Sequence, residues 1–206
     1  YGEPAGQEAT DSWRSLWDMM LAQMGYIVIA MDNRGTPCLK GTEWRKCLYG
    51  KVGVLNTRDQ AMAIREVMQW GFIDSTRLAV WGWSGGGCTG MAVAPVTNQL
   101  TYDNIYTERY MGLPSENPGA YEESSAMNFA EGLRGNLLLV HGTGDDNVHY
   151  QNTEMVINEL IRHNKTFTMM AYPNRSHGIY EGANTRRHLY TLLTNYLMEN
   201  CPAGGR

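Results

Sequence analysis

The apolar run Leu78–Trp83 leads directly into Ser84 and a series of glycines. With Gly82 and Gly86 it forms Gly-x-Ser-x-Gly, the pattern by which a strand delivers a serine into a sharp turn. The glycines remove side chains that would collide where strand and following helix cross, and Ser84 must adopt a strained backbone to point its oxygen outward. The pentapeptide also occurs in ordinary glycine-rich turns, so alone it leaves a structural turn and a nucleophile both open.

The composition is that of one globular domain. The chain has 206 residues, 43% of them hydrophobic and 18% charged. Its formal net charge is −4 and its Lys and Arg are scattered, which argues against nucleic acid or an anionic membrane as a partner. No segment approaches the ~20 apolar residues of a membrane helix, and there is no basic and apolar leader. The opening Tyr1–Pro4 reads as a strand end running into a loop, so we expect a domain over residues 1–206 whose upstream part is missing.

The cysteines do not indicate a metal site. Cys38, Cys47, Cys88 and Cys201 form no Cys-x-x-Cys pair and none has a histidine at ligand spacing. Buried or incidental thiols are therefore favoured over zinc ligands, and we expect neither a metal nor an organic cofactor. A bridge between Cys88 and Cys201 stays open, because sequence does not give disulfide geometry.

Strand-like and helix-like segments alternate along the chain, which predicts an α/β fold with a parallel sheet covered on both faces. The run 26–31 is apolar on both sides, as in a central parallel strand. Residues 36–54 have no sustained period and predict an extended loop, and residues 97–123 look like a lid or pocket segment. The predicted helices cover about 13–24, 57–70, 153–163 and 189–197, and the predicted strands 26–31, 78–83, 137–141 and 167–172.

Three polar residues follow the ends of predicted strands. Ser84 follows one strand, Asp145 the next well-defined strand and His177 the last. Ligands gather at this edge of parallel sheets, and the order Ser, Asp, His is that of α/β-hydrolases. A serine hydroxyl needs a neutral imidazole to take its proton, and the imidazole needs a carboxylate to fix its tautomer. Each residue alone could be a surface or turn residue, but their conjunction favours a catalytic triad.

Acyl transfer also requires hydrogen-bond donors for the developing oxyanion. The turn supplies the backbone N–H of Gly85. Removing one such donor costs about 100- to 1000-fold in rate, so a second donor is expected. Spacing alone does not identify it.

Several longer stretches carry a resemblance to a known family. They resemble the catalytic domain of the dipeptidyl peptidase IV group within the prolyl oligopeptidase family of serine peptidases, with bacterial members the most similar. The likeness runs from Tyr1 to about Cys201 and implies an α/β-hydrolase fold, a mostly parallel sheet with helices on both faces. It rests on Gly82–Gly87, Tyr106–Pro114, His141–His149, Ser176–Gly178 and Asp32–Gly35.

The resemblance implies roles for the residues of the site. Ser84 would be the nucleophile, Asp145 rather than Asp146 the acid, and His177 the base. Tyr1, in a Tyr-Gly-x-Pro motif, would be the side-chain oxyanion donor beside the Gly85 N–H.

The resemblance also implies a substrate pocket. A flat apolar pocket suits the rigid proline ring, which gains apolar burial and loses little entropy. The alternative is that the tyrosines of this pocket belong to the core. The implied lining residues are Tyr102, Tyr106, Val96 and Val148, with Asn147 binding a substrate carbonyl.

The sequence departs from the family pattern in its pocket and its domains. Gln99 stands where the family carries a pocket tryptophan, and Gly85 where many members have a tyrosine. The upstream β-propeller that supplies the acidic residues gripping the substrate's free amine is not in this sequence. Nothing in these residues therefore enforces removal of dipeptides over internal cleavage.

A further departure follows the serine turn. After Gly87 the family continues through a helix and a loop, whereas here Cys88–Gly90 leads directly to Met91–Val96. The missing helix is the one whose N-terminus would assist the oxyanion. Either a segment has been deleted from this sequence, or the polypeptide lacks the helix and Ser84 is poorly held, which would impair activity.

These observations predict a serine exopeptidase that removes N-terminal dipeptides ending in proline or alanine through an acyl-enzyme on Ser84. The alternatives are an endopeptidase or esterase of the same fold, or a truncated, non-catalytic module. The resemblance implies a peptide as substrate and a periplasmic or extracellular location, and it leaves a homodimer open.

Overall fold

A four-stranded sheet forms the centre of the molecule. The computed structural model describes residues 1–4, 6–37, 39–86 and 90–204. The strands lie in the order β1 (Trp81–Trp83), β2 (Met91–Val93), β3 (Leu138–Gly142) and β4 (Thr168–Tyr172), and each pairs with its neighbours in parallel. The carboxyl ends of the strands therefore meet at one edge, as the sequence predicts.

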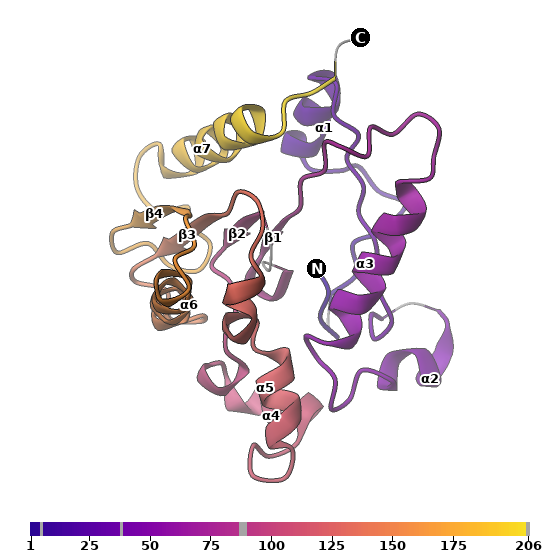
Figure 1. Ribbon diagram of the computed structural model, residues 1–206, viewed down its shortest axis with the longest axis vertical. Helices are drawn as coiled ribbons and strands as arrows, with labels where there is room; N and C mark the ends of the chain where they lie inside the picture. Colours follow the sequence, from indigo (N-terminus) through magenta and orange to yellow (C-terminus); the bar gives the residue numbers. More distant parts are fainter. Residues whose placement is uncertain (5, 38, 87–89, 205–206) are drawn as a thin grey trace.

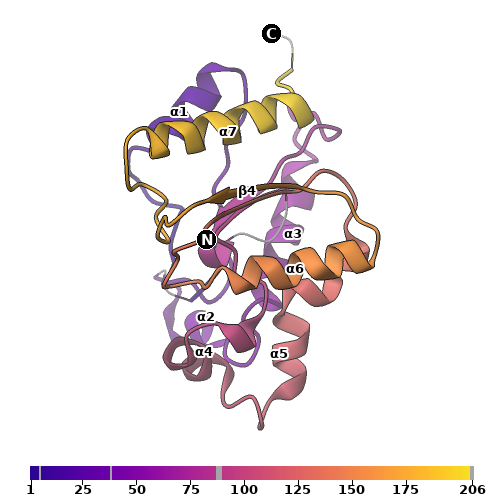
Figure 2. The same ribbon diagram turned by 90° about the vertical axis from the view of Figure 1, so that its left-hand side faces the viewer.

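Helices cover both faces of this sheet (Figures 1 and 2). α7 (Thr185–Asn200) lies along one face together with α1 (Leu16–Gln23), and α6 (Gln151–Arg162) lies on the other. Side chains of β3 alternate between the two layers. Leu138 and Val140 join the core under α7, while Leu139 joins the core under α6. The predicted α/β architecture is thus confirmed.

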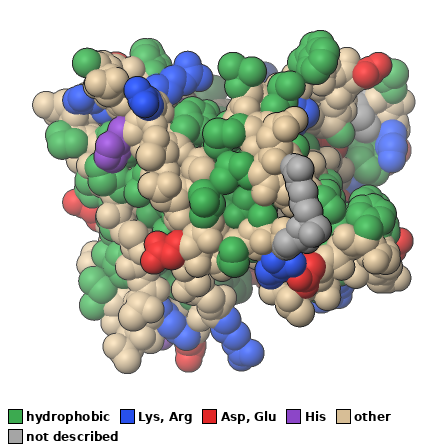
Figure 3. Space-filling view, turned by 90° about the horizontal axis from the view of Figure 1, so that it is seen from above, with side chains coloured by type: hydrophobic (Ala, Val, Ile, Leu, Met, Phe, Trp, Pro, Cys, Tyr) green, Lys and Arg blue, Asp and Glu red, His purple; other side chains and the backbone are tan. Residues whose placement is uncertain are grey.

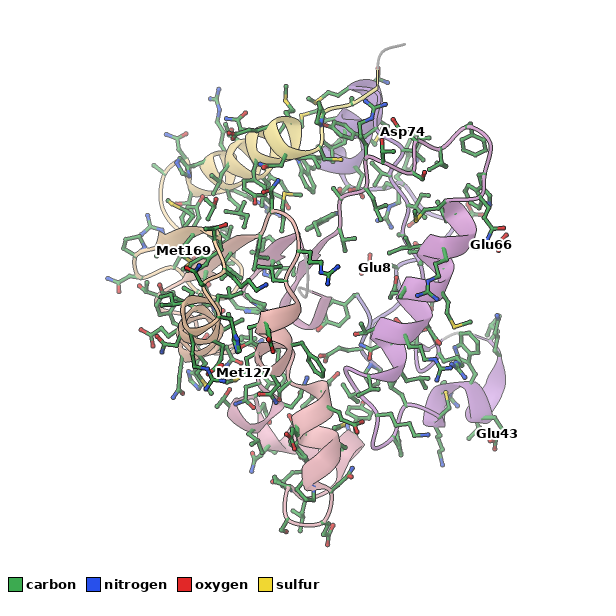
Figure 4. The ribbon with its side chains drawn as sticks, viewed as in Figure 1. Glu8, Glu43, Glu66, Asp74, Met127 and Met169 are labelled. Atoms are coloured by element: carbon green, nitrogen blue, oxygen red, sulfur yellow. The ribbon has the colours of Figure 1, made fainter. Side chains whose placement is uncertain are left out.

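The layer under α6 continues into the segment before β3. Met127, from the 3-10 segment Ala126–Gly132, and Met169, from β4, contact the core of Ala92, Leu139 and Leu160. Figure 4 shows both methionines on the α6 side of the molecule. Apolar contacts thus join α6 to the sheet and to the segment before β3.

The predicted lid segment 97–123 contains helices and no strand. Asp103 caps α4 (Asn104–Met111) by accepting from the N–H groups of Ile105 and Tyr106 at 2.8 and 3.2 Å. Pro118 begins α5 (Pro118–Ser124), where its fixed φ suits the first turn. A small core of Leu48, Val52, Met111 and Tyr121 joins these helices to the segment 36–54.

The expected strand 26–31 is wrong. The chain there is extended but belongs to no strand, and Ile27 and Ile29 are 55% and 39% exposed. Only Tyr26 and Val28 contact the core, so the run is apolar on both sides but covered on one. A strand needs a hydrogen-bonded neighbour, and among the described residues this run has no such ladder to β1.

Other predicted elements shift at their ends. The helix expected over 57–70 is α3 (Leu55–Val67), and the loop expected over 36–54 contains the short helix α2 (Gly41–Lys46). The helix expected over 13–24 begins only at Leu16, because Ser15 caps it by accepting from the Asp18 N–H. Trp13 and Leu16, expected on its apolar face, are 90% and 84% exposed, so that part of the prediction is wrong.

The connection from β1 to β2 is short. A single 3-10 turn, Ser84–Gly86, follows β1. The family's helix after the serine turn, which the sequence was expected to lack, is not found among the described residues before β2. Parallel neighbours are usually joined by a dozen or more residues. Gly87 and Cys88, on which the turn motif and the considered disulfide partly depend, lie outside the described residues.

Charged side chains are interspersed on the surface seen in Figure 3, with Lys and Arg among acidic and apolar groups. Across the described residues, no helix has the length and apolar content needed to cross a membrane.

Candidate active site

Ser84 lies at the end of β1 in the turn predicted for it. Its φ is 57°, in the left-handed region that non-glycine residues rarely adopt. The residue is buried, with 7% of its surface exposed. The strain expected of a serine in a strand-to-helix turn is therefore present, and it is characteristic of functional sites.

Asp145 and His177 are in direct contact at the same edge of the sheet. His177 Nδ1 lies 2.7 Å from Asp145 Oδ2. The other oxygen, Oδ1, accepts from the N–H groups of Asn147 and Val148, each at 2.9 Å. Burial alone would raise the pKa of the Asp145 carboxyl, but hydrogen bonds from His141, His177 and the Asn147 N–H outweigh it and hold that pKa well below its ordinary value. The acid is thus kept ionised beside the base.

Hydrogen bonds bring the histidine loop to the end of β1 and to the loop that follows β3. The indole Nε1 of Trp83 donates to the His177 carbonyl oxygen at 3.0 Å, which ties the loop to the residue preceding Ser84. At the end of β3, a Cβ on Gly142 would collide with the Arg175 carbonyl. The Gly144 N–H donates to that same carbonyl at 3.1 Å, so the acid and base loops approach backbone to backbone.

The carboxylate of Glu181 holds the loop that carries His177. Glu181 accepts from the backbone N–H of Ser176 at 3.1 Å and also from the Ser176 hydroxyl. These contacts hold the residue directly before His177. The loop is therefore fixed on both sides of the imidazole.

Tyr1 lies next to the nucleophile. Burial and the nearby Glu3 carboxyl raise the pKa of the Tyr1 hydroxyl, and an interaction with the Ser84 side chain partly offsets them. The segment is anchored by Asn33, whose Nδ2 donates to the Gly2 carbonyl at 3.0 Å. A neutral phenol at this position can donate a hydrogen bond toward charge that develops near Ser84.

Glu3 is a buried acidic residue whose position the sequence does not reveal. It is 4% exposed, it accepts a hydrogen bond from the Tyr106 hydroxyl, and a Cβ on Gly85 would collide with its carboxyl carbon. Where many family members carry a tyrosine side chain, this chain thus places the Glu3 carboxyl. Burial raises the pKa of Glu3, and the Tyr106 hydrogen bond opposes the rise only in part.

Of the predicted pocket residues, the two tyrosines and Asn147 are partly or fully exposed, whereas the two valines are buried. Tyr102 and Tyr106 meet edge to face, with ring centroids 5.6 Å apart. The Tyr102 hydroxyl donates to Asn147 Oδ1 at 3.1 Å, so Asn147, predicted to bind a substrate carbonyl, lies beside this pair. Val96 and Val148 are 6% and 0% exposed, so they support the site from below and present little surface.

The described residues hold no cluster of three or more His, Cys, Asp or Glu side chains that could bind a metal ion. Cys47 and Cys201 are free thiols in this part of the chain. Gln99, in the place of the family's tryptophan, is buried, and it accepts no hydrogen bond at Oε1 within the described structure.

Sequence reasoning missed two residues of the site. His141 belongs to the stretch His141–His149 that carries the resemblance, and its place near the end of a buried strand, four residues before Asp145, was the available signal. For Glu3 no comparable signal exists, because its burial depends on the absent side chain of Gly85.

Comparison with known proteins supports the resemblance. The sequence profile of the Prolyl oligopeptidase family matches residues 13–202. Prolyl endopeptidase FAP of Mus musculus is 39% identical over 217 residues, which cover 97% of this chain and 28% of that protein. Dipeptidyl peptidase 4 of Bos taurus is 35% identical with the same coverage. The crystal structure of Porphyromonas gingivalis dipeptidyl peptidase 4 superposes with a TM-score of 0.92 at 42% identity, over 97% of this chain and 30% of that one.

The lengths of these matches show how much of each relative the chain spans and that the mouse relative has additional residues in this region. The chain spans 28% of the mouse relative and 30% of the bacterial one. The alignment to the mouse protein runs over 217 residues, more than the 206 of this chain, so the relative carries residues in this region that the chain lacks. This agrees with the short connection between β1 and β2.

Proposed function

Because the chain belongs to the prolyl oligopeptidase family of serine peptidases, we propose that it is a catalytic domain in which Ser84, Asp145 and His177 form the triad. The observation that carries the proposal is the 2.7 Å contact between His177 Nδ1 and Asp145 Oδ2. The Trp83 indole brings the backbone of this histidine to the residue adjoining the serine. In this arrangement the acid orients the His177 imidazole, which can then act as base toward the Ser84 hydroxyl.

The proposed reaction begins at the Ser84 oxygen, which attacks the scissile carbonyl while His177 takes its proton through Nε2. Asp145 holds the Nδ1–H and stabilises the imidazolium that forms. The Tyr1 hydroxyl and the Gly85 N–H donate to the oxyanion. His177 then protonates the leaving amine, and water hydrolyses the acyl-enzyme with His177 again as base.

For the substrate we propose peptides with proline or alanine before the scissile bond. The edge-to-face pair Tyr102 and Tyr106 offers flat aromatic surface for a small or cyclic side chain. Asn147 supplies an amide N–H for a substrate carbonyl. Removal of N-terminal dipeptides is the finer proposal, and a periplasmic or extracellular location stays a prediction.

The first test is covalent labelling of the serine. A fluorophosphonate probe is expected to label the chain and to leave Ser84→Ala unlabelled. Ser75→Ala serves as control, because it removes an exposed hydroxyl that lies before β1. A folded wild-type chain that takes no label would contradict the proposal and favour a non-catalytic module.

The second test separates the two classes of peptidase. Gly-Pro p-nitroanilide and its N-acetylated form are compared on the protein containing this domain. Faster cleavage of the free amine supports dipeptide removal, whereas equal rates indicate an endopeptidase. Cleavage of simple esters without cleavage of either anilide would indicate an esterase.

A further inference from the structure

A second histidine is buried behind the acid of the triad. His141 lies at the end of β3 and is 0% exposed. Its Nε2 is 3.0 Å from Asp145 Oδ2 and 2.9 Å from the Val148 carbonyl oxygen. Its Nδ1 is 2.7 Å from Thr153 Oγ1, in α6. Every polar atom of the ring therefore has a partner.

The partners define where the ring hydrogen lies. Both neighbours of Nε2 are acceptors, a carboxylate oxygen and a backbone carbonyl, so Nε2 carries the hydrogen. In the neutral ring Nδ1 is then an acceptor, and the Thr153 hydroxyl donates to it. Thr153 is itself 0% exposed, so no water competes for this bond. The hydroxyl thus sets the tautomer in which His141 donates to the acid.

His141 completes the hydrogen bonding of the Asp145 carboxylate. Oδ1 accepts from two backbone N–H groups, and Oδ2 accepts from His141 and His177. An ionised carboxylate has about four such acceptor positions, and all are filled here. Without the His141 donor, Oδ2 would keep a bond only to His177, and that side of the carboxyl plane would no longer be fixed.

We propose that His141 is a positioning residue for the peptidase reaction, which orients Asp145 Oδ2 toward His177, and that Thr153 fixes the His141 tautomer. The inference rests on the proposed function, because it assigns a role within the same triad. His141 touches neither substrate nor the reacting atoms. Its effect reaches the reaction through the acid.

The decisive variants differ in their donor at this position. His141→Leu removes the Nε2 donor, and His141→Gln retains an N–H at similar reach. Loss of a group that orients a metal ligand typically costs about 10- to 100-fold in activity, and we expect an effect of similar size for this acid. We expect His141→Leu to lower kcat by about this factor with an unchanged KM, and His141→Gln to recover most of the loss. Equal impairment of both variants, or a wild-type kcat in His141→Leu, would overturn the proposal.

Thr153 provides a milder pair of variants. Thr153→Val removes the hydroxyl while it keeps the shape of the side chain, and Thr153→Ser keeps the hydroxyl. We expect kcat to fall in Thr153→Val and to remain near wild type in Thr153→Ser. Should His141→Leu not fold, this pair decides, and equal kcat values in the two folded variants would refute the role of Thr153 and His141.

A spectroscopic measurement keeps this inference separate from the proposed function. The proton on His177 Nδ1 is observed by NMR and assigned by its loss in His177→Gln. It requires no turnover, so a wild-type chain without peptidase activity would end the proposed function while this resonance still reports on Asp145. We expect the resonance to shift in His141→Leu and in Thr153→Val. An unchanged resonance in both folded variants would overturn the proposal.

Discussion

The proposed acid and base follow β3 and β4, in one half of the sheet, and the proposed nucleophile follows β1, in the other half. β3 and β4 each have five residues and lie between α6 and α7, whereas β1 and β2 have three each. β1, which leads to Ser84, is partly exposed along its length, with Trp81 36% exposed, whereas β3, which leads to Asp145, is buried throughout. The strand before Asp145 is thus more deeply buried than the strand before Ser84.

The two halves of the sheet hold their site residues in different ways. Asp145 and His177 are held by hydrogen bonds within the second half. Ser84 has a positive φ, its side chain interacts with Tyr1, and it follows Trp83, whose indole donates to the histidine loop. We therefore expect changes in the second half to act mainly on chemistry, and changes around Ser84 to act also on positioning.

The largest expected effect comes from the acid. Asp145→Asn replaces the carboxylate that holds the His177 Nδ1–H, which favours the wrong tautomer and lowers kcat by about 10⁴-fold. Steady-state kinetics on a proline anilide measure it. Asp146→Asn is the matched control, because this neighbouring side chain is exposed, and a comparable loss there would contradict the assignment of the acid.

A smaller effect is expected on the nucleophile side. Tyr1→Phe removes the hydroxyl beside Ser84 and is expected to lower kcat by about 100- to 1000-fold, as for loss of one oxyanion donor. Labelling by fluorophosphonate should slow in parallel. Tyr49→Phe, at a 49% exposed position away from the triad, is the control. An unchanged kcat in Tyr1→Phe would leave the oxyanion without its proposed side-chain donor.

Stability variants sharpen the comparison between the halves. Leu193→Ala, at a position with 0% exposure, is expected to lower the free energy of unfolding by about 2–5 kcal/mol. Leu16→Ala, at an 84% exposed position, should change it by less than about 0.5 kcal/mol. Urea unfolding followed by circular dichroism measures both. Equal losses would contradict the difference in burial between these two side chains.

The smallest expected effect concerns Glu3 and pH. Burial raises the pKa of this carboxyl above its ordinary value of 4.5, so the folded chain binds the proton more tightly than the unfolded chain. Its contribution to stability is present below that ordinary value and is lost as the pH rises through the raised pKa. Glu3→Gln carries no charge, so its unfolding free energy should lack this fall. Parallel pH curves for the two proteins would argue against a buried carboxyl.

The sequence predicted the second half well because its strands and helices bury their apolar positions. Residues 137–141 and 167–172 are mostly apolar, and both overlap observed strands. Their ends place Asp145 and His177 together, as the order of the motifs indicates. The expected roles of Ser84, Gly85 and Tyr1 stay predictions until they are tested by activity.

The first half was harder to predict for a physical reason. Ile27 and Ile29 are as apolar as strand residues, but apolarity does not supply the hydrogen-bonded neighbour that makes a strand. The contact between Glu3 and Gly85 depends on space left by a missing side chain, which no pattern of residues along the chain encodes. His141 belongs to the motif His141–His149, but its proposed role depends on its contacts with Asp145 and with Thr153 of α6, which the structure shows.

The close approach at Gly142 has a consequence for variation in this site. The acid and base loops meet here through main-chain atoms, so the backbone at position 142 limits how closely they approach. A substitution that adds even a methyl group at this position would drive the two loops apart, and the contact between Asp145 and His177 would lengthen with them.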